Sequence, residues 1–146
     1  MVNPDDFTEH TFDNLKDHFD FQNNDTYKQR YWVNDVYWTA DTSGPNFLYI
    51  CGEGVGGVPT TSMYPFMVGA SHGARLWSLE HRFYGSSQPY DDWSLESFEK
   101  LSSQQAMADI AYFLGQMNKD LPSRQTIVIG GSYPGALSGW FRARYP

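Results

Sequence analysis

Three short, mostly apolar runs predict buried β-strands. They are Phe47–Cys51, Ala74–Leu79 and Thr126–Gly130. Apolar runs of this length, without regular alternation, are typical of strands that are covered on both faces, as in a parallel sheet. An earlier stretch, Gln29–Trp38, is dense in β-forming residues and predicts a further strand.

Segments whose apolar residues or composition predict helices lie between and after these apolar runs. From Ser102 onward, apolar residues recur at i, i+3, i+4 and i+7 until Pro122, which predicts a helix. Ser102 and Gln105 match a capping box at its start. Thr61–Ala70 and Gly135–Tyr145 predict two shorter helices. Strands and helices therefore alternate, which favours the α/β class with a mostly parallel sheet and helices on both of its faces.

The last apolar run leads directly into Gly131-Ser132-Tyr133-Pro134. A serine on a sharp turn between strand and helix is the nucleophile elbow of an α/β-hydrolase, so we predict Ser132 as nucleophile and the Tyr133 backbone N–H as an oxyanion donor. An ordinary tight turn is the alternative, because Gly and Ser are common in turns. Pro134 replaces the second glycine of G-x-S-x-G, but proline fits the first turn of a helix.

A second oxyanion donor in this fold comes from the loop after an earlier strand, and Gly52, Glu53 and Gly54 follow the first apolar run. The alternative is a flexible glycine turn. Glu53 would repel an anionic intermediate unless it faced a cation. Its carboxylate is interpreted as a partner for a substrate α-ammonium, a partner for Arg82, or a surface charge.

The chain has four histidines, and all of them precede Ser132: His10, His18, His72 and His81. In α/β-hydrolases the acid and the histidine follow the serine, and neither follows it here. The chain order of chymotrypsin or subtilisin would allow His81 with Asp91 or Asp92 as a triad. Those orders belong to folds with a different sequence pattern, so we expect His81 to be structural, near Arg82.

Composition and short motifs exclude several classes of partner and binding site. The formal net charge of −7 argues against nucleic acid as a partner. The chain shows no membrane-spanning run, and its first residues do not form a signal peptide. No spacing typical of a metal or cofactor site is present, so we expect neither. Cys51, the only cysteine, is expected to be a small buried hydrophobe. Asn24 begins a glycosylation pattern.

Six segments in order resemble a single protein family. They are Leu15–Phe19, Gln29–Trp32, Gly52–Gly54, Leu79–Ser87, Leu101–Ala106 and Gly130–Gly135. The family is that of the serine peptidases lysosomal Pro-X carboxypeptidase, dipeptidyl peptidase II and thymus-specific serine protease. The resemblance runs from Leu15 to Pro146, and Tyr31–Asp35 looks most like the thymus-specific branch. The resemblance is specific because the Ser132 motif is preceded by the segment Glu80-His81-Arg82-Phe83-Tyr84-Gly85.

The resemblance implies an α/β-hydrolase domain with a helical cap and a Ser-Asp-His triad. It also implies cleavage of peptides next to proline, mostly from a chain end, in lysosomes or vacuoles or after secretion, and a homodimer for the full-length form. Of the triad only Ser132 maps onto this sequence. Residues 1–146 are therefore expected to be the N-terminal part of such a domain, without the cap and the C-terminal part, and inactive alone.

Two other functions stay open at this point. The first is a lipase or esterase on the same fold, which the segment Glu80–Gly85 and Tyr133 disfavour. The second is a non-catalytic remnant that only binds peptides.

Overall fold

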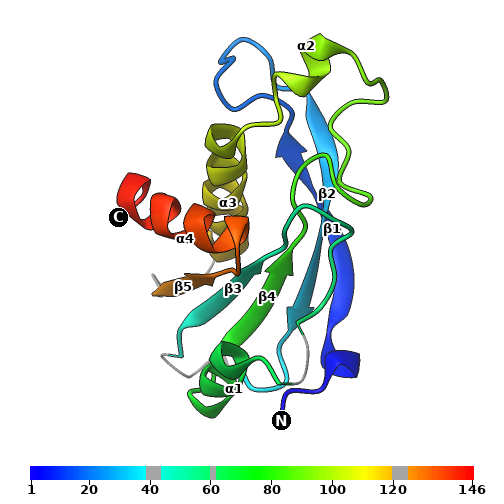
Figure 1. The fold of residues 1–146 in the computed structure, drawn as a ribbon. Coiled ribbons are helices and arrows are strands. Elements are labelled where there is room, and N and C mark those ends of the chain that lie inside the picture. Colours follow the sequence, from blue (N-terminus) through cyan, green and yellow to red (C-terminus); the bar gives the residue numbers. More distant parts are fainter. Residues whose placement is uncertain (39–43, 60–61, 120–124) are drawn as a thin grey trace.

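A computed structural model describes residues 1–38, 44–59, 62–119 and 125–146. These residues form a five-stranded sheet in the order β1-β2-β4-β3-β5 (Figure 1). The strands are β1 (Thr8–Leu15), β2 (Thr26–Asn34), β3 (Asn46–Ile50), β4 (Arg75–Leu79) and β5 (Thr126–Ile129). The helices are α1 (Tyr64–Ser71), α2 (Leu95–Phe98), α3 (Ser103–Asn118) and α4 (Tyr133–Arg144), and a 3₁₀ turn covers Pro4–Asp6.

The sheet is mixed. Strand β3 runs parallel to both β4 and β5, while β2 is antiparallel to β4 and to β1. The predicted α/β class is therefore confirmed, and the antiparallel strands are an addition on the N-terminal side. Strand β1 lies in a segment without a clear period, because it is an edge strand and most of its residues are exposed.

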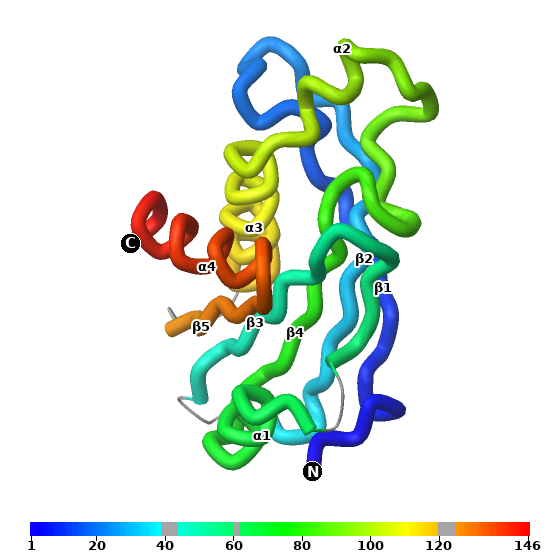
Figure 2. Tube along the Cα trace, viewed as in Figure 1, coloured from blue at the N-terminus to red at the C-terminus, as the bar shows by residue number. Residues whose placement is uncertain are grey.

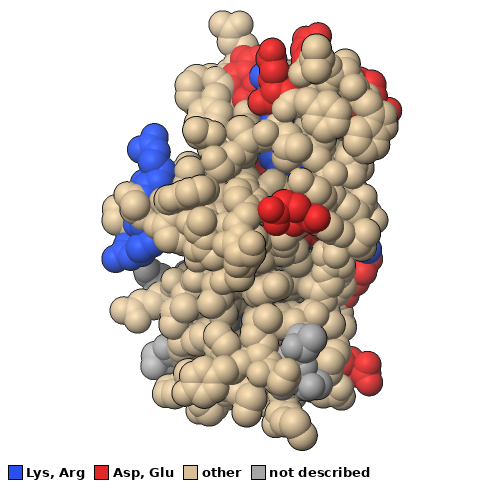
Figure 3. All heavy atoms as spheres, in the orientation of Figure 1, with Lys and Arg blue, Asp and Glu red and all other residues tan. Residues whose placement is uncertain are grey.

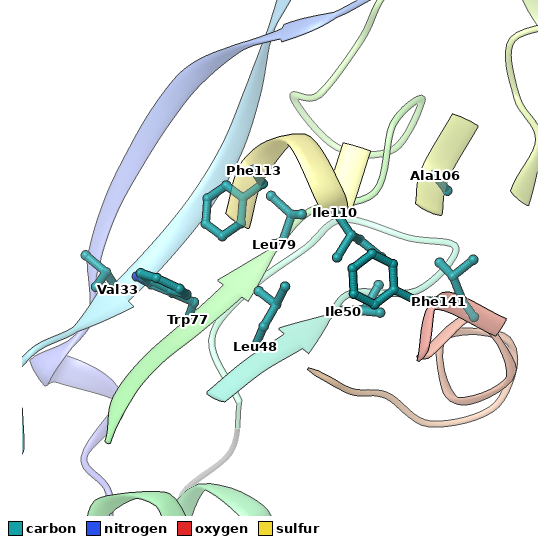
Figure 4. Packing of buried hydrophobic residues seen from close by; sticks show 10 residues of the cluster. Val33, Leu48, Ile50, Trp77, Leu79, Ala106, Ile110, Phe113 and Phe141 are labelled. Carbon is teal, nitrogen blue, oxygen red and sulfur yellow. The ribbon is translucent and has the colours of Figure 1, made fainter. Parts of the chain in front are cut away.

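Helices α3 and α4 cover one face of the sheet (Figure 1). Leu48 of β3 and Trp77 of β4 point toward this side, where they meet Phe113 and Ile110 of α3 and Phe141 of α4 (Figure 4). Leu48, Trp77 and Phe113 are at most 1% exposed. The heptad-like spacing seen from Ser102 onward thus marks the side of α3 that contacts the sheet.

The neighbouring residues of the same strands face the other way, toward α1. Phe47 of β3 and Leu76 of β4 pack with Phe66 of α1 and with Ala74. Successive strand side chains point to opposite faces, so a strand covered on both sides needs an unbroken apolar run. This explains why β3 and β4 could be located from sequence.

Strand β5 lies at the edge of the sheet that the described residues form, although its apolar run predicted a buried strand like β3 and β4. It pairs with β3 on one side, and Ile127 is 45% exposed. A hollow of about 650 Å³ follows its outer side, beneath Phe141 and Tyr145.

The start of α3 forms only half of a capping box. Ser102 Oγ accepts a hydrogen bond from the Gln105 N–H at 3.2 Å, as predicted. The Gln105 side chain does not return to Ser102. Its Oε1 accepts from the His18 N–H at 3.0 Å and its Nε2 donates to Asp17 at 2.5 Å. Gln105 therefore ties α3 to the loop between β1 and β2.

A buried ion pair joins α3 to the end of β4. Arg82 Nε donates to Asp109 Oδ2 at 2.6 Å and Arg82 Nη2 donates to Oδ1 at 2.7 Å. Tyr27 and His18 also bond to the same carboxylate. The remaining guanidinium donors reach backbone carbonyls: Leu15, Lys16 and Lys100. Burial raises the pKa of Asp109, but Arg82 and His18 outweigh it and hold that pKa below its usual value.

Charges are unevenly spread over the face seen in Figure 3. Acidic side chains gather over α2 and the β1–β2 loop, and basic ones gather at the end of α4, which carries Arg142 and Arg144. Among the described residues, none of the helices has the length and apolar character needed to cross a membrane.

We predict that Asp109→Asn lowers the free energy of unfolding by about 3–5 kcal/mol, because it leaves Arg82 charged and buried without its partner. Urea denaturation followed by circular dichroism measures the effect. Asp13→Asn is the matched control, since Asp13 pairs with Lys28 in an exposed bridge and should cost at most about 1 kcal/mol. Equal effects of the two substitutions would contradict the prediction.

Acid should also destabilise the chain in a defined window. Burial raises the pKa of Asp17, but hydrogen bonds from Lys100, Phe19 and Gln105 outweigh it and lower that pKa to about 2. Asp109 is shifted in the same direction. A carboxylate whose folded pKa is depressed stabilises the fold above its unfolded pKa and loses that contribution as pH falls through the folded pKa.

We therefore expect the free energy of unfolding to decline from about pH 4 toward pH 2. Urea midpoints at several pH values in this range measure the decline, and Asp17→Asn should make it shallower. A stability that is constant between pH 6 and pH 2 would show that these carboxylates are not shifted.

Candidate active site

Ser132 stands at the turn between β5 and α4. Strand β5 ends at Ile129, one residue before the predicted strand end, and α4 begins at Tyr133, two residues before the predicted helix start, so Ser132 lies between a strand and a helix as predicted. The backbone of Ser132 has φ 58° and ψ −131°, a region that non-glycine residues rarely adopt. Backbone strain of this kind concentrates at functional sites. Ser132 is exposed, and its hydroxyl forms no hydrogen bond with another described residue.

The turn needs a glycine on its strand side. A Cβ on Gly130 would lie 2.6 Å from the Cβ of Pro134, which is closer than real Cβ contacts. Pro134 is buried in the first turn of α4, where its missing N–H is not needed. Pro134 therefore occupies the space that a side chain at residue 130 would fill.

The Tyr133 amide points out of the start of α4. The first N–H groups of a helix have no acceptor within it, and the positive end of the helix dipole lies there. This amide follows directly after Ser132, so it can donate to an oxyanion formed at that serine. Its suitability comes from the backbone and does not depend on the tyrosine side chain.

The loop after β3 meets the turn, as predicted. Leu48 of β3 pairs with Val128 of β5 in parallel register, so both strands end at the same side of the sheet (Figure 2). A Cβ on Gly52 would lie 3.4 Å from Pro134 Cγ. The Gly54 N–H donates to the Gly52 carbonyl at 3.0 Å, so it is already used. The amides of Gly52 and Glu53 remain as candidates for the second donor.

Glu80 anchors this loop, a role that the sequence reasoning missed. Its side chain is fully buried, and Oε1 accepts from the Gly56 N–H at 2.8 Å and from Arg30 Nη2 at 2.7 Å. Its Oε2 accepts from Ser87 Oγ at 2.7 Å and from the Ser86 N–H at 3.1 Å. Burial raises the pKa of Glu80, but Arg30 and the other donors outweigh it and keep the carboxylate ionised.

The turn after Glu80 is shaped by the same carboxylate. Gly85 has φ 54°, and a Cβ there would lie 2.6 Å from Glu80 Cδ. A Cβ on Gly56 would lie 2.9 Å from Glu80 Cγ. Both glycines therefore allow backbone to close around Glu80. The signal available in the sequence was a carboxylate at the end of a buried strand, two residues before an arginine.

His81 hydrogen-bonds the Tyr133 side chain and forms no hydrogen bond with Ser132. Its Nδ1 lies 2.8 Å from the Arg82 carbonyl and must carry the proton, so Nε2 accepts from the Tyr133 hydroxyl at 3.1 Å. Burial lowers the pKa of His81, which favours this neutral form. The expected structural role next to Arg82 is confirmed, through the arginine backbone.

The alternative triad does not form. Asp92 accepts hydrogen bonds from the N–H of Ser94, the N-cap of α2, at 2.8 Å and from Ser97 Oγ at 2.9 Å, so it supports the start of that helix. Asp91 is exposed. All four histidines lie within the described residues, and none of them hydrogen-bonds Ser132.

Glu53 is not a partner of Arg82, so that interpretation was wrong. Arg82 is fully buried and directed at Asp109, while Glu53 is exposed at the surface of its loop. Within the described part of the chain, Glu53 forms no ion pair or side-chain hydrogen bond. It lies instead at a cavity of about 300 Å³ that Tyr84, Tyr133 and Trp140 also line.

Two other residues singled out from the sequence, Cys51 and Asn24, do not line this cavity. Cys51 is buried, as expected, with its sulfur near Ser78 Oγ and the Gly57 carbonyl, and burial raises the pKa of its thiol. Asn24 is exposed in the β1–β2 loop, and its glycosylation stays a prediction. Within the described ranges, no group of three or more His, Cys, Asp or Glu residues could hold a metal ion.

We predict that Gly130→Ala lowers the free energy of unfolding by about 1–3 kcal/mol or more, because the new methyl group overlaps Pro134. Gly131→Ala is the control one residue along. A Cβ there meets nothing within 4 Å, and the change should stay within about 0.5 kcal/mol. Urea denaturation of both variants measures the difference, and equal stabilities would contradict the tight approach of β5 and α4.

Comparisons with known proteins agree with this geometry. Residues 14–146 match the family model described as Serine carboxypeptidase S28. Human thymus-specific serine protease is 38% identical over 137 residues, which cover 90% of this chain and 26% of that protein. Mouse lysosomal Pro-X carboxypeptidase is 37% identical over 143 residues, which cover 92% of this chain and 29% of that protein. The chain thus spans less than a third of these relatives.

Solved structures share the fold. One comes from a study of two prolyl endopeptidases, with a TM-score of 0.58 and 19% identity, covering 99% of this chain and 20% of that one. Another is a cold-adapted esterase from an Arctic intertidal metagenomic library, with a TM-score of 0.54 and 16% identity, covering 93% of this chain and 55% of that one. At these identities they show the α/β-hydrolase fold alone. Because the family model covers nearly the whole chain, through the turn that carries Ser132, the chain belongs to the serine carboxypeptidase S28 family.

Proposed function

We propose that this chain supplies the nucleophile and the oxyanion hole of a serine-type exopeptidase of the prolyl carboxypeptidase or dipeptidyl peptidase type. The observation that carries the proposal is the strained, exposed Ser132 between β5 and α4, in a member of a serine carboxypeptidase family. Ser132 Oγ gives its proton to a general base and attacks the scissile carbonyl. The C–N bond then breaks, the amine product leaves with that proton, and water hydrolyses the remaining acyl-enzyme ester to release the acid and restore Ser132.

The oxyanion is stabilised by backbone amides. The Tyr133 N–H donates to the negative oxygen from one side, and an amide of Gly52 or Glu53 donates from the other. Two contacts support this arrangement. The loop approaches Pro134 through Gly52, and Glu80 holds the loop through the Gly56 N–H. The donors are fixed before substrate binds, so little reorganisation is needed when charge develops.

The general base comes from outside residues 1–146. We propose that these residues are the N-terminal part of a peptidase domain whose helical cap, triad Asp and triad His belong to the remainder, and that the chain alone is inactive. Supporting observations are that no histidine of the chain, all four being described, contacts Ser132, and that the chain covers 26% and 29% of two relatives. The exposed Ile127 on β5 also favours further structure beside that strand.

The proposed substrates are peptides, including proline-containing ones. The name of the mouse relative includes Pro-X carboxypeptidase and places that protein in the lysosome. We propose the same kind of substrate and a lysosomal location for this protein. A vacuolar location or secretion is the equivalent proposal for other cells. A homodimer of the full-length form remains part of the same proposal.

Activity is tested in a chimera. Residues 1–146 replace the matching segment of mouse lysosomal Pro-X carboxypeptidase, which is 37% identical. We expect the folded chimera to hydrolyse a prolyl peptide and to be labelled by a fluorophosphonate, while the 146-residue chain alone gives only background rates. Removal of a triad member costs several powers of ten in rate, so the isolated chain should lose about 10⁴-fold or more.

Two variants of the chimera serve as controls. Ser132→Ala should abolish both turnover and labelling. Ser138→Ala, on the same helix, removes a hydroxyl that only bonds the Gly135 carbonyl, and it should keep most of the activity. A folded chimera that hydrolyses esters but no peptide would favour the esterase alternative. Turnover by the isolated chain that His81→Ala abolishes would instead assign the base to His81.

A further inference from the structure

A small cavity with aromatic walls lies next to the candidate nucleophile. It has a volume of about 300 Å³. The rings of Tyr84, Tyr133, Trp140 and His81 line one part of it, and Leu101, Ser102 and Ser103 at the start of α3 line another. The His81 ring contacts Tyr84 and Tyr133 with centroid separations of 5.4 and 5.6 Å, so it fixes the position of both phenols. Tyr133 directly follows Ser132, so one wall of the cavity is formed by the residue next to the candidate nucleophile.

The charge at this cavity is negative. Glu53 lines it, is exposed, and has no ion-pair partner among the described residues. Figure 3 shows an acidic group over the loop after β3, with a small area of Lys or Arg atoms above it on the same face. Lysine and arginine do not occur among the lining residues. Burial lowers the pKa of His81 and favours its neutral form, and this outweighs the opposite effect of the hydrogen bond to the Arg82 carbonyl.

Aromatic faces and a nearby carboxylate together form a site for a positively charged amine. The negative face of a Tyr or Trp ring attracts an ammonium group, and the attraction is stronger where water is partly excluded. A carboxylate at the rim adds a directional, charge-assisted hydrogen bond. An anionic group would be repelled by Glu53, and a neutral group would gain neither an ion pair with Glu53 nor the cation–π attraction of the rings.

We propose that this cavity is a substrate subsite that binds an ammonium group of the peptide, with Glu53 as the residue that determines the preference. The inference rests on the proposed function for its biological meaning. Its physical content, binding of an amine at Glu53, stands independently of catalysis. An ammonium group can come from a free amino terminus or from a lysine side chain, and the cavity volume admits either.

Binding is measured on the 146-residue chain by ¹H–¹⁵N correlation spectra. Three probes are titrated: alanine amide, which has a free α-ammonium; Nα-acetyl-lysine amide, which has only a side-chain ammonium; and Nα-acetyl-alanine amide, which is neutral. We expect at least one ammonium probe to shift the Trp140 indole signal and the Glu53 and Tyr133 amides in a saturable way. The probe that binds more tightly identifies the source of the ammonium group.

Glu53→Gln should raise the dissociation constant of the ammonium probe at least tenfold while the rest of the spectrum stays unchanged. Glu96→Gln removes an exposed charge on α2, away from the cavity lining, and should leave binding as it is. Equal shifts by the neutral probe, no shift with either ammonium probe, or unchanged binding after Glu53→Gln would each overturn the proposal. None of these readings depends on turnover, so an inactive chimera would refute the proposed function and leave the subsite standing.

Discussion

Two opposite charges buried at the end of β4, Glu80 and Arg82, constrain everything around the candidate site. An ion removed from water must be paired and hydrogen-bonded, or folding becomes unfavourable by several kcal/mol. Glu80 accepts hydrogen bonds from Arg30 of β2 and from the Gly56 amide, and Arg82 forms an ion pair with Asp109 of α3. The sheet, α3 and the loops are therefore joined by the hydrogen bonds and ion pairs that these two buried side chains require.

His81 lies between these two charges and has a separate task. It takes one hydrogen bond with the Arg82 carbonyl and one with the Tyr133 hydroxyl, so it links β4 to the first residue of α4. The frame of the candidate site is therefore made by residues that would never touch a reacting atom. This accounts for the specific sequence Glu80-His81-Arg82, in which each side chain serves a different neighbour.

Sequence was informative where a local rule decides the structure. Strands covered on both faces had to be apolar, α3 showed its helical period, and the turn at Ser132 followed directly from a strand. It was not informative where partners lie far apart along the chain. Strand β1 is polar because it lies at an edge, and Glu80 finds Arg30 fifty residues away. Gln105 matched a local cap, yet its side chain bonds His18 and Asp17 in another loop.

The packing of Gly130 against Pro134 has a consequence for how such turns are recognised. In G-x-S-x-G both flanks of the serine are small, which suggests that both must be. Here the tightest approach is at Gly130 on the strand side, and the position two residues after the serine carries a ring that restricts the backbone of the first turn. The glycine of the helix side lies one residue later, at Gly135, where a Cβ would be 3.0 Å from the Gly130 carbonyl oxygen. A glycine two residues after the serine is therefore not required, and a pattern that demands one at that position would pass over this elbow.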